Sequence, residues 1–317
     1  MYNTIFWWCI FAAMLSCTLG FLFLRYIKQF VRSSIRAYVN EIHQAKELTP
    51  TMGGLFFIGA FLITLLCSIS WSNSKVWIIA LTTIGFGAVG FCDDWFKIVR
   101  HKGITEKQKF ISQFLIALLA LLIWFFWEKP STLVHIPFLP HLSLNINWLL
   151  IPWGIWILLS STNAVNITDG LDGLAGSLVA IVSAVFGIIA WLQGDYSLAL
   201  IAWIFASTLL GFLWFNSCPA KVFMGDVGSL ACGGFIGMIA LMTRQELLLP
   251  IVAGVMVIEV LSVIMQVSTF KLTGRRILKM APLHHHFELC GIPETKITTR
   301  CILITMVLGL VALAGFC

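Results

Sequence analysis

The sequence predicts an all-α polytopic membrane protein with about ten transmembrane helices. Mean hydropathy is +0.95, and 59% of the 317 residues are hydrophobic. Charged residues make up 11% of the chain, whereas a soluble domain would carry roughly 25%. The apolar residues gather in runs suited to a hydrocarbon core of ~30 Å. We expect residues 1–317 to form one integral membrane domain, in which the first run is a retained span rather than a cleaved signal.

Ten apolar runs define the predicted spans, at residues 4–24, 54–71, 76–92, 110–127, 147–162, 174–193, 197–215, 229–243, 248–270 and 300–316. The loops between them alternate sides. All Lys and Arg residues except Lys75, Lys129 and Arg244 fall on or beside one set of loops. The positive-inside rule places this set in the cytoplasm and both termini outside. The net charge of +6 is therefore a topology signal that also suits anionic lipids, and nucleic acid is not required as a partner.

The acidic residues follow the same division, because every aspartate except Asp195 lies on the cytoplasmic side near a span end. Asp93 and Asp94 end the third span, and lysines follow them on the same loop. Adjacent aspartates cannot share a helix face, so we expect different roles for them. Carboxylates that converge at one place need a cation or lysines to coexist. The nine cysteines lie mostly in apolar runs without CxxC spacing, and they indicate neither disulfides nor zinc.

The most polar stretch between two apolar runs is NAVNITDGLDG at residues 163–173. Asn163 and Asn166 are three residues apart, as are Asp169 and Asp172, so each pair would share a face of a helical turn. The stretch is either a polar loop between helices or a site that binds a metal or a polar ligand.

Two further segments contain residues suited to phosphate or metal binding. In FMGDVGS, Asp226 precedes the eighth span, where a helix N-terminus favours phosphate and the carboxylate offers Mg²⁺ a hard oxygen ligand. The alternative is a simple helix cap, and Phe223 either stacks on a base or packs. In PLHHHFELCG, three consecutive histidines chelate a single zinc ion poorly but suit a phosphate or pyrophosphate.

The segment HQAKELTPTMGG leads into the second span. Thr49-Pro50-Thr51 predicts a turn, and Gly53-Gly54 allows close approach of the backbone. Lys46 is either a phosphate contact or a lysine that sets topology. In the ninth span, Glu259, Ser262 and Gln266 form a polar stripe that either lines a groove or pins the helix. Taken together, these groups suit phosphoryl transfer on a metal-held pyrophosphate between a lipid and a soluble anionic nucleotide.

Four segments, DDWFK, NAVNITDGLDGLAG, VFMGDVGSLACGG and PLHHHFELCG, resemble in this order the polyprenyl-phosphate N-acetylhexosamine-1-phosphate transferase superfamily. TPTMGG and HHHFE make the chain similar to its phospho-N-acetylmuramoyl-pentapeptide-transferase branch. The resemblance implies ten transmembrane helices in the bacterial inner membrane, with the active-site cleft at the cytoplasmic face. It also implies Mg²⁺-dependent transfer from UDP-MurNAc-pentapeptide to undecaprenyl phosphate, which gives lipid I and UMP for peptidoglycan synthesis, and it suggests a homodimer.

The resemblance also implies roles for individual residues. The catalytic candidates are Asp93, Asp94, Asp226, His284 and Lys109. The substrate-binding candidates are Lys46, Thr51, Asn166, Asp169, Asp172, Asn216, Phe223, His285 and His286, to which the spacing adds Asn163. Asp226 is the expected Mg²⁺ ligand, with Asp93, Asp94 and Asp169 as further candidates.

The expected chemistry is direct attack of the lipid phosphate on the nucleotide, with Asp93 accepting its proton or orienting it. A two-step route through an aspartyl intermediate stays open. The chain departs from the family at Cys218, where a histidine is usual, and at Val39-Asn40, where Gly-Pro is usual. The alternatives are a sibling transferase that uses UDP-GlcNAc and a membrane transporter. The HHHFE block argues against the first, and the one-sided charge without a visible repeat argues against the second.

Overall fold

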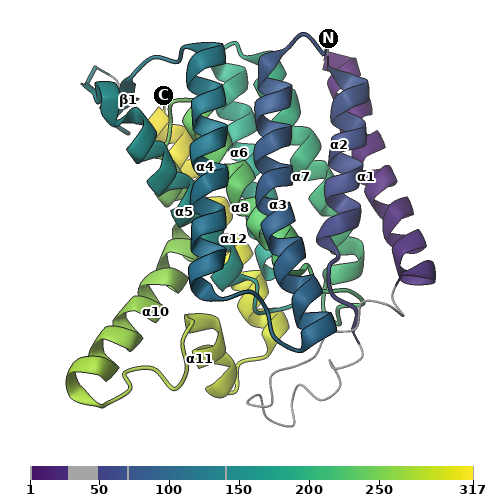
Figure 1. The fold of residues 1–317 in the computed structure, drawn as a ribbon, viewed down its shortest axis with the longest axis vertical. Helices are drawn as coiled ribbons and strands as arrows, with labels where there is room; N and C mark the ends of the chain where they lie inside the picture. Colours follow the sequence, from purple (N-terminus) through teal and green to yellow (C-terminus); the bar gives the residue numbers. More distant parts are fainter. Residues whose placement is uncertain (1, 28–48, 70, 140, 317) are drawn as a thin grey trace.

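The computed structural model describes residues 2–27, 49–69, 71–139 and 141–316. Within these residues the chain is almost entirely helical (Figure 1). The elements are α1 (Tyr2–Tyr26), α2 (Gly54–Ser68), α3 (Ser74–Arg100), α4 (Glu106–Glu128), β1 (Leu133–His135), β2 (Ser143–Asn145), the short 3-10 helix η2 (Asn147–Leu149), α5 (Leu150–Thr168), α6 (Leu174–Leu192), α7 (Tyr196–Asn216), α8 (Gly225–Met242), α9 (Leu249–Val252), α10 (Gly254–Thr273), α11 (Leu283–Leu289) and α12 (Glu294–Phe316).

Nine helices in the described ranges are long and apolar enough to cross a membrane, which confirms the prediction of an all-α polytopic membrane protein. The second predicted span is occupied by α2, an apolar helix of 15 residues. Each of the ten predicted spans therefore coincides with an apolar helix. The ninth is divided at Ala253 into the short α9 and the longer α10.

The core of the bundle is built around α8, which packs against α3 on one side and α5 on another, while α7 packs against α1 and α6. Almost every side chain of α8 is buried, as expected for a helix that is apolar all round. Its glycines allow neighbouring backbones to approach closely. Phe235 of α8 stacks on Phe205 of α7 with ring centroids 3.7 Å apart, and both rings meet the edge of Phe61 from α2.

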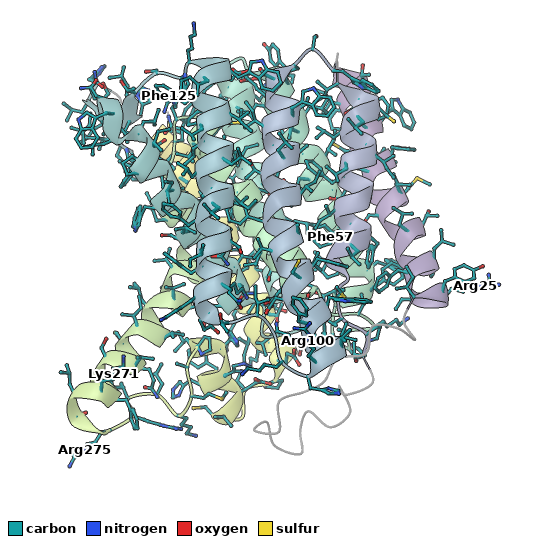
Figure 2. All side chains as sticks on the ribbon, in the orientation of Figure 1. Arg25, Phe57, Arg100, Phe125, Lys271 and Arg275 are labelled. Atoms are coloured by element: carbon teal, nitrogen blue, oxygen red, sulfur yellow. The ribbon has the colours of Figure 1, made fainter. Side chains whose placement is uncertain are left out.

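Positive charge is concentrated at one end of the bundle. Figure 2 shows Arg25, Arg100, Lys271 and Arg275 at this end, whereas Phe125 lies near the other. The start of α1 and the end of α12 both lie at the end opposite the labelled basic residues (Figure 1). This asymmetry agrees with the charge pattern along the sequence. Beside α5, α10 diverges from the bundle and extends past its basic end, and α11 contacts both α10 and α12.

Several helices extend beyond the apolar runs that predicted them. α3 continues to Arg100, α5 to Thr168, and α12 begins already at Glu294. Hydropathy falls at the first polar residues, but backbone hydrogen bonding continues the helix past them. Asp93 and Asp94 consequently lie within α3 rather than after it.

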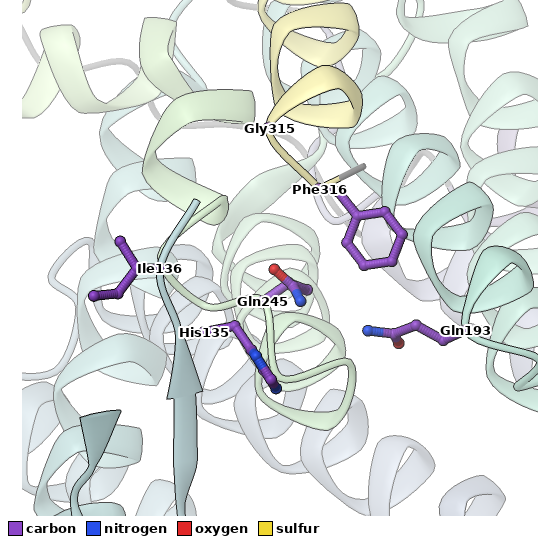
Figure 3. Close-up of a pocket in the computed structure, with 6 residues that line it drawn as sticks. All are labelled: His135, Ile136, Gln193, Gln245, Gly315 and Phe316. Carbon is purple, nitrogen blue, oxygen red and sulfur yellow. The ribbon is translucent and has the colours of Figure 1, made fainter. Parts of the chain in front are cut away.

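The opposite end of the bundle carries a small hairpin in which Val134 of β1 pairs with Leu144 of β2. This hairpin lies between the fourth and fifth predicted spans. Beside it lies a cavity of about 210 Å³ (Figure 3), lined by His135, Ile136, Gln193, Gln245, Gly315 and Phe316. Gln193 follows α6 at this end, so the cavity is separated by the length of α6 from the aspartates that precede the helix.

Candidate active site

Three aspartates and two lysines form one compact cluster at the basic end of the bundle. Asp93 and Asp94 lie on α3, and Asp226 lies in the first turn of α8. Lys97 Nζ is 2.7 Å from Asp93 Oδ2, 3.0 Å from Asp226 Oδ2 and 3.6 Å from Asp94 Oδ1. Lys109 Nζ, from α4, is 2.6 Å from Asp226 Oδ2 and 3.6 Å from Asp93 Oδ2. The lysines supply the positive charge that converging carboxylates require.

Close packing of α3 on α8 brings these carboxylates together. Gly90, one turn before Asp94, lies so near α8 that a Cβ there would be 2.1 Å from the backbone oxygen of Asp226. On the other side of α8, Gly54 would place a Cβ 2.4 Å from the Gly228 backbone. The structure thus uses the glycine pair at the start of the second span for close backbone approach, as the sequence predicts.

The adjacent aspartates have different partners. Asp93 Oδ1 accepts the backbone N–H of Ile104 at 2.9 Å, which fixes the loop between α3 and α4. Asp94 Oδ2 accepts the N–H of Val227 at 3.1 Å, which ties α3 to the first turn of α8. Both carboxylates are buried, so these hydrogen bonds replace the water that each would otherwise lose.

Two asparagines of α5 extend the cluster. Asn166 Nδ2 donates to Asp226 Oδ1 at 3.1 Å and to Ser229 Oγ at 2.8 Å. Asn163 Nδ2, one turn earlier, donates to Gln113 Oε1 at 3.0 Å. Their three-residue spacing therefore places both on the polar face of α5, with Asn166 in direct contact with Asp226.

The prediction that Asp169 and Asp172 share a face of a helical turn is wrong. α5 ends at Thr168, and residues 169–173 form an irregular turn that closes at Gly173, with φ of +74°. Because this turn is not helical, the two aspartates point to different surroundings. Asp172 Oδ2 accepts the N–H of Ala220 at 2.9 Å. Burial and the negative charges of Asp226, Asp94 and Asp172 raise the pKa of Asp169 to about 8.

Two loops that carry substrate-binding candidates are joined by backbone hydrogen bonds. Phe223 N–H donates to Pro50 O at 2.8 Å, and Gly53 N–H donates to Phe223 O at 2.9 Å. Thr51 lies beside Gly225, at the start of α8. Asn216 is buried, where its Oδ1 accepts Gly173 N–H at 3.1 Å and its Nδ2 donates to Val222 O at 2.9 Å. Asn216 therefore connects the turn at residues 169–173 to the loop that leads into α8.

The three histidines stand on α11 in three different environments. His284 is buried, with Nδ1 3.1 Å from Glu259 Oε2 of α10. His285 Nδ1 lies 2.8 Å from Glu288 Oε2. His286 Nδ1 accepts the backbone N–H of Lys279 at 3.2 Å. The block is therefore a folded helix with separate contacts for each ring, and it is unlike a zinc-chelating cluster.

Sequence reasoning missed Lys97 as a site residue, although it contacts all three clustered aspartates. The available signal was its position four residues after Asp93, on the same helix face. Lys46, Val39 and Asn40 lie outside the described residues. Cys218, which the sequence left without a role, brings its sulfur within 4.8 Å of carboxylate oxygens of Asp172 and Glu294. These three residues come from separate segments, and no sequence spacing connects them.

The cluster has the chemistry of a phosphate-transfer site. Carboxylate oxygens of Asp93 and Asp226 lie close to the same two ammonium groups, so they already occupy positions suited to sharing a cation. Such hard oxygen donors fit a divalent ion such as Mg²⁺. The lysines are equally suited to the oxygens of a phosphate once one enters the site.

Comparisons with known proteins agree on one relationship. A family model described as glycosyl transferase family 4 matches residues 76–244. The chain is 38% identical to a phospho-N-acetylmuramoyl-pentapeptide-transferase of Aquifex aeolicus, over 92% of this chain and 86% of that protein. Proteins of the same name from Desulfovibrio desulfuricans and from Ruegeria sp. are 41% and 44% identical. They are aligned over 96% and 86% of this chain, and over 90% and 81% of their own lengths.

Proposed function

The chain belongs to glycosyl transferase family 4 and to the phospho-N-acetylmuramoyl-pentapeptide-transferases, and on that premise we propose the reaction that it performs. The enzyme transfers phospho-MurNAc-pentapeptide from UDP-MurNAc-pentapeptide to undecaprenyl phosphate. The products are lipid I and UMP, in the first membrane step of peptidoglycan synthesis. The observation that carries the proposal is the cluster in which Lys97 and Lys109 hold Asp93, Asp94 and Asp226 together.

In the proposed reaction, a phosphate oxygen of undecaprenyl phosphate attacks the β-phosphorus of the nucleotide. The bond from this phosphorus to the bridging oxygen breaks, and the bridging oxygen leaves as part of UMP. Asp93 accepts the proton of the lipid phosphate or orients that phosphate for attack. Lys97 and Lys109 donate to phosphoryl oxygens as negative charge develops on them, which is the main contribution that a protein makes to phosphoryl transfer.

The proposed cofactor is Mg²⁺, held by Asp226 with Asp93, Asp94 and Asp169 as further candidate ligands. When bound, the ion would neutralise the pyrophosphate and the UMP leaving group. The nucleotide side of the site is proposed to include Asn163, Asn166, Asp172, Asn216 and Phe223, with Thr51, Lys46, His285 and His286 around it. His284 is buried, so its proposed role is to support this side of the site from behind. Asn216 and Asn166 act there by fixing the loops and the carboxylate that surround the nucleotide.

The proposed location is the bacterial inner membrane, with the aspartate cluster facing the cytoplasm. The support is the concentration of Lys and Arg at the end of the bundle that carries the cluster.

The test is UMP release by the purified protein in detergent with undecaprenyl phosphate, UDP-MurNAc-pentapeptide and Mg²⁺. We expect release that needs the lipid, is abolished by EDTA and is lost in Asp226→Ala. The matched control is Asp195→Asn, because Asp195 is an aspartate at the opposite end of the bundle, where it pairs with Lys75. The control should retain wild-type turnover. Turnover of UDP-GlcNAc without any turnover of the muramyl nucleotide would refute the proposed substrate.

A further inference from the structure

The polar stripe on α10 takes no direct part in the reaction described above, yet its side chains are fully engaged. Gln266 Oε1 accepts the N–H groups of Ile277 and Leu278 at 3.1 and 3.0 Å. Gln266 Nε2 donates to Leu278 O at 3.0 Å. Two turns earlier on α10, Glu259 Oε2 accepts the backbone N–H of His284 at 3.3 Å. These contacts direct Gln266 toward the loop before α11 and Glu259 toward the start of α11, the segments that follow α10 at the basic end in Figure 1.

Glu259 of α10 and His284 of α11 form a buried pair. Glu259 is 3% exposed and His284 is 1% exposed. The imidazole Nδ1 is 3.1 Å from Glu259 Oε2, although the contact lacks the alignment of a good hydrogen bond. Nε2 has no hydrogen-bond partner among the described residues. His284 is thus held by the carboxylate on one side, and its other nitrogen is pressed against protein rather than open to a substrate.

His284 packs against the turn at residues 169–173, the aspartate turn, which carries Asp169 and Asp172. A Cβ on Gly170 would lie 2.2 Å from His284 Nε2, so the imidazole occupies the space in which any side chain at position 170 would stand. On its far side the turn is held by Asn216, which accepts the N–H of Gly173, and by Ala220, which donates to Asp172. The aspartate turn therefore contacts the loop before α8 on one side and the imidazole of His284 on the other.

We propose that Glu259 is a positioning residue for the nucleotide site. It holds His284 against Gly170, and this contact fixes the turn that carries Asp169 and Asp172. The inference rests on the proposed transfer reaction, in which this turn lines the nucleotide site. The contacts of Glu259 and Gln266 also favour one of the two predicted uses of the α10 stripe, which is to pin the helix. If the stripe lined a lipid groove, its side chains would face hydrocarbon instead of α11 and the loop before it.

The first test separates the two substrates. In Glu259→Ala, we expect KM for UDP-MurNAc-pentapeptide to rise about tenfold, because a buried partner is lost, while KM for undecaprenyl phosphate stays within about twofold. Glu259→Gln keeps an oxygen that accepts the His284 N–H and should restore most of the nucleotide affinity. The control is Leu261→Ala, which changes a half-exposed side chain on the same helix and should leave KM for the nucleotide unchanged. A rise in KM for the lipid alone would overturn the inference in favour of a groove.

The second test uses the contact between His284 and Gly170 directly. The backbone at Gly170 is not left-handed, so the cost of Gly170→Ala comes from collision with the imidazole. Gly170→Ala should lower kcat/KM for the nucleotide by about tenfold in the wild-type background and by less than about twofold in His284→Ala. Independent, multiplicative losses in the double variant would show that the two residues do not act through one contact.

A third measurement does not depend on catalysis. Hydrogen exchange of the backbone amides at residues 169–173 should be faster in Glu259→Ala than in the wild type, and near the wild-type rate in Glu259→Gln. Unchanged exchange in Glu259→Ala would overturn the positioning role even if the enzyme lost activity. A wild-type protein without turnover would instead refute the proposed function, and the exchange measurement would still decide the structural inference.

Discussion

The sharpest prediction concerns Lys97, which sequence reasoning did not place in the site. In Lys97→Met, the cluster loses an ammonium group that lies within 3.6 Å of all three aspartates. Removal of one partner from a fully buried ion pair costs about 3–5 kcal/mol. The Lys97 side chain is 37% exposed, so solvent screens the loss and about 2 kcal/mol is the better expectation for its cost in stability.

Thermal unfolding in detergent with EDTA should therefore show a fall in Tm of roughly 5 °C for Lys97→Met. Mg²⁺ should restore more stability to the variant than to the wild type, because it replaces the missing positive charge among the carboxylates. In the activity assay, kcat should fall by about 100-fold, as expected when a donor to the developing phosphoryl charge is removed.

The matched control is Lys75→Met at the opposite end of the bundle. Lys75 also pairs with an aspartate, Asp195, and its side chain is 28% exposed. Because Lys75 balances one carboxylate where Lys97 balances three, its loss should cost less than ~1 kcal/mol and should not respond to Mg²⁺. If Lys97→Met unfolded at the wild-type temperature in EDTA, or gained no more from Mg²⁺ than the wild type, the charge-balance reasoning would be refuted.

Three further predictions follow from packing and exposure. Gly90→Ala should push α3 from α8, because its Cβ would meet the backbone of Asp226, and should abolish UMP release while lowering Tm by several degrees; a fully active variant would contradict this. Phe205→Ala removes the partner stacked on Phe235 and should cost about 3–5 kcal/mol in unfolding experiments, with a loss below ~1 kcal/mol arguing against a packed core there. Alkylation of the exposed Cys218 should inhibit UMP release and be slowed by the nucleotide, while Cys218→Ser should be active and resistant; equal inhibition of that variant would assign the effect to another cysteine.

The sequence predicts the helices well and their ends less well. Apolar runs locate all ten spans, because hydropathy measures the burial in lipid that determines them. It does not report where a helix stops, since polar residues at the membrane surface continue backbone hydrogen bonding. α3 therefore passes Asp93 and Asp94, and α5 includes Asn163 and Asn166.

The candidate site shows a similar limit. Motif spacing identified Asp93, Asp94 and Asp226, which the structure brings together. It failed for Asp169 and Asp172, because α5 ends at Thr168 and the next helix starts only after Gly173, so the spacing of three residues lies in an irregular turn. Contacts between distant segments, such as Glu259 with His284, carry no signal in local periodicity. They depend on how the chain after α10 returns through α11 to the aspartate turn, which is a property of the tertiary structure.

Charge counting across the cluster explains why the site would need a cation as well as its lysines. Asp93, Asp94 and Asp226 contribute three negative charges when ionised, and Lys97 and Lys109 return two positive charges, so the cluster keeps one excess negative charge. A pyrophosphate would be repelled by that excess at short range. A divalent cation changes the balance to one excess positive charge, which attracts the pyrophosphate and frees the lysines to donate to its oxygens. The lysines supply positive charge between the carboxylates, and in the proposed reaction admission of the nucleotide would depend on the metal.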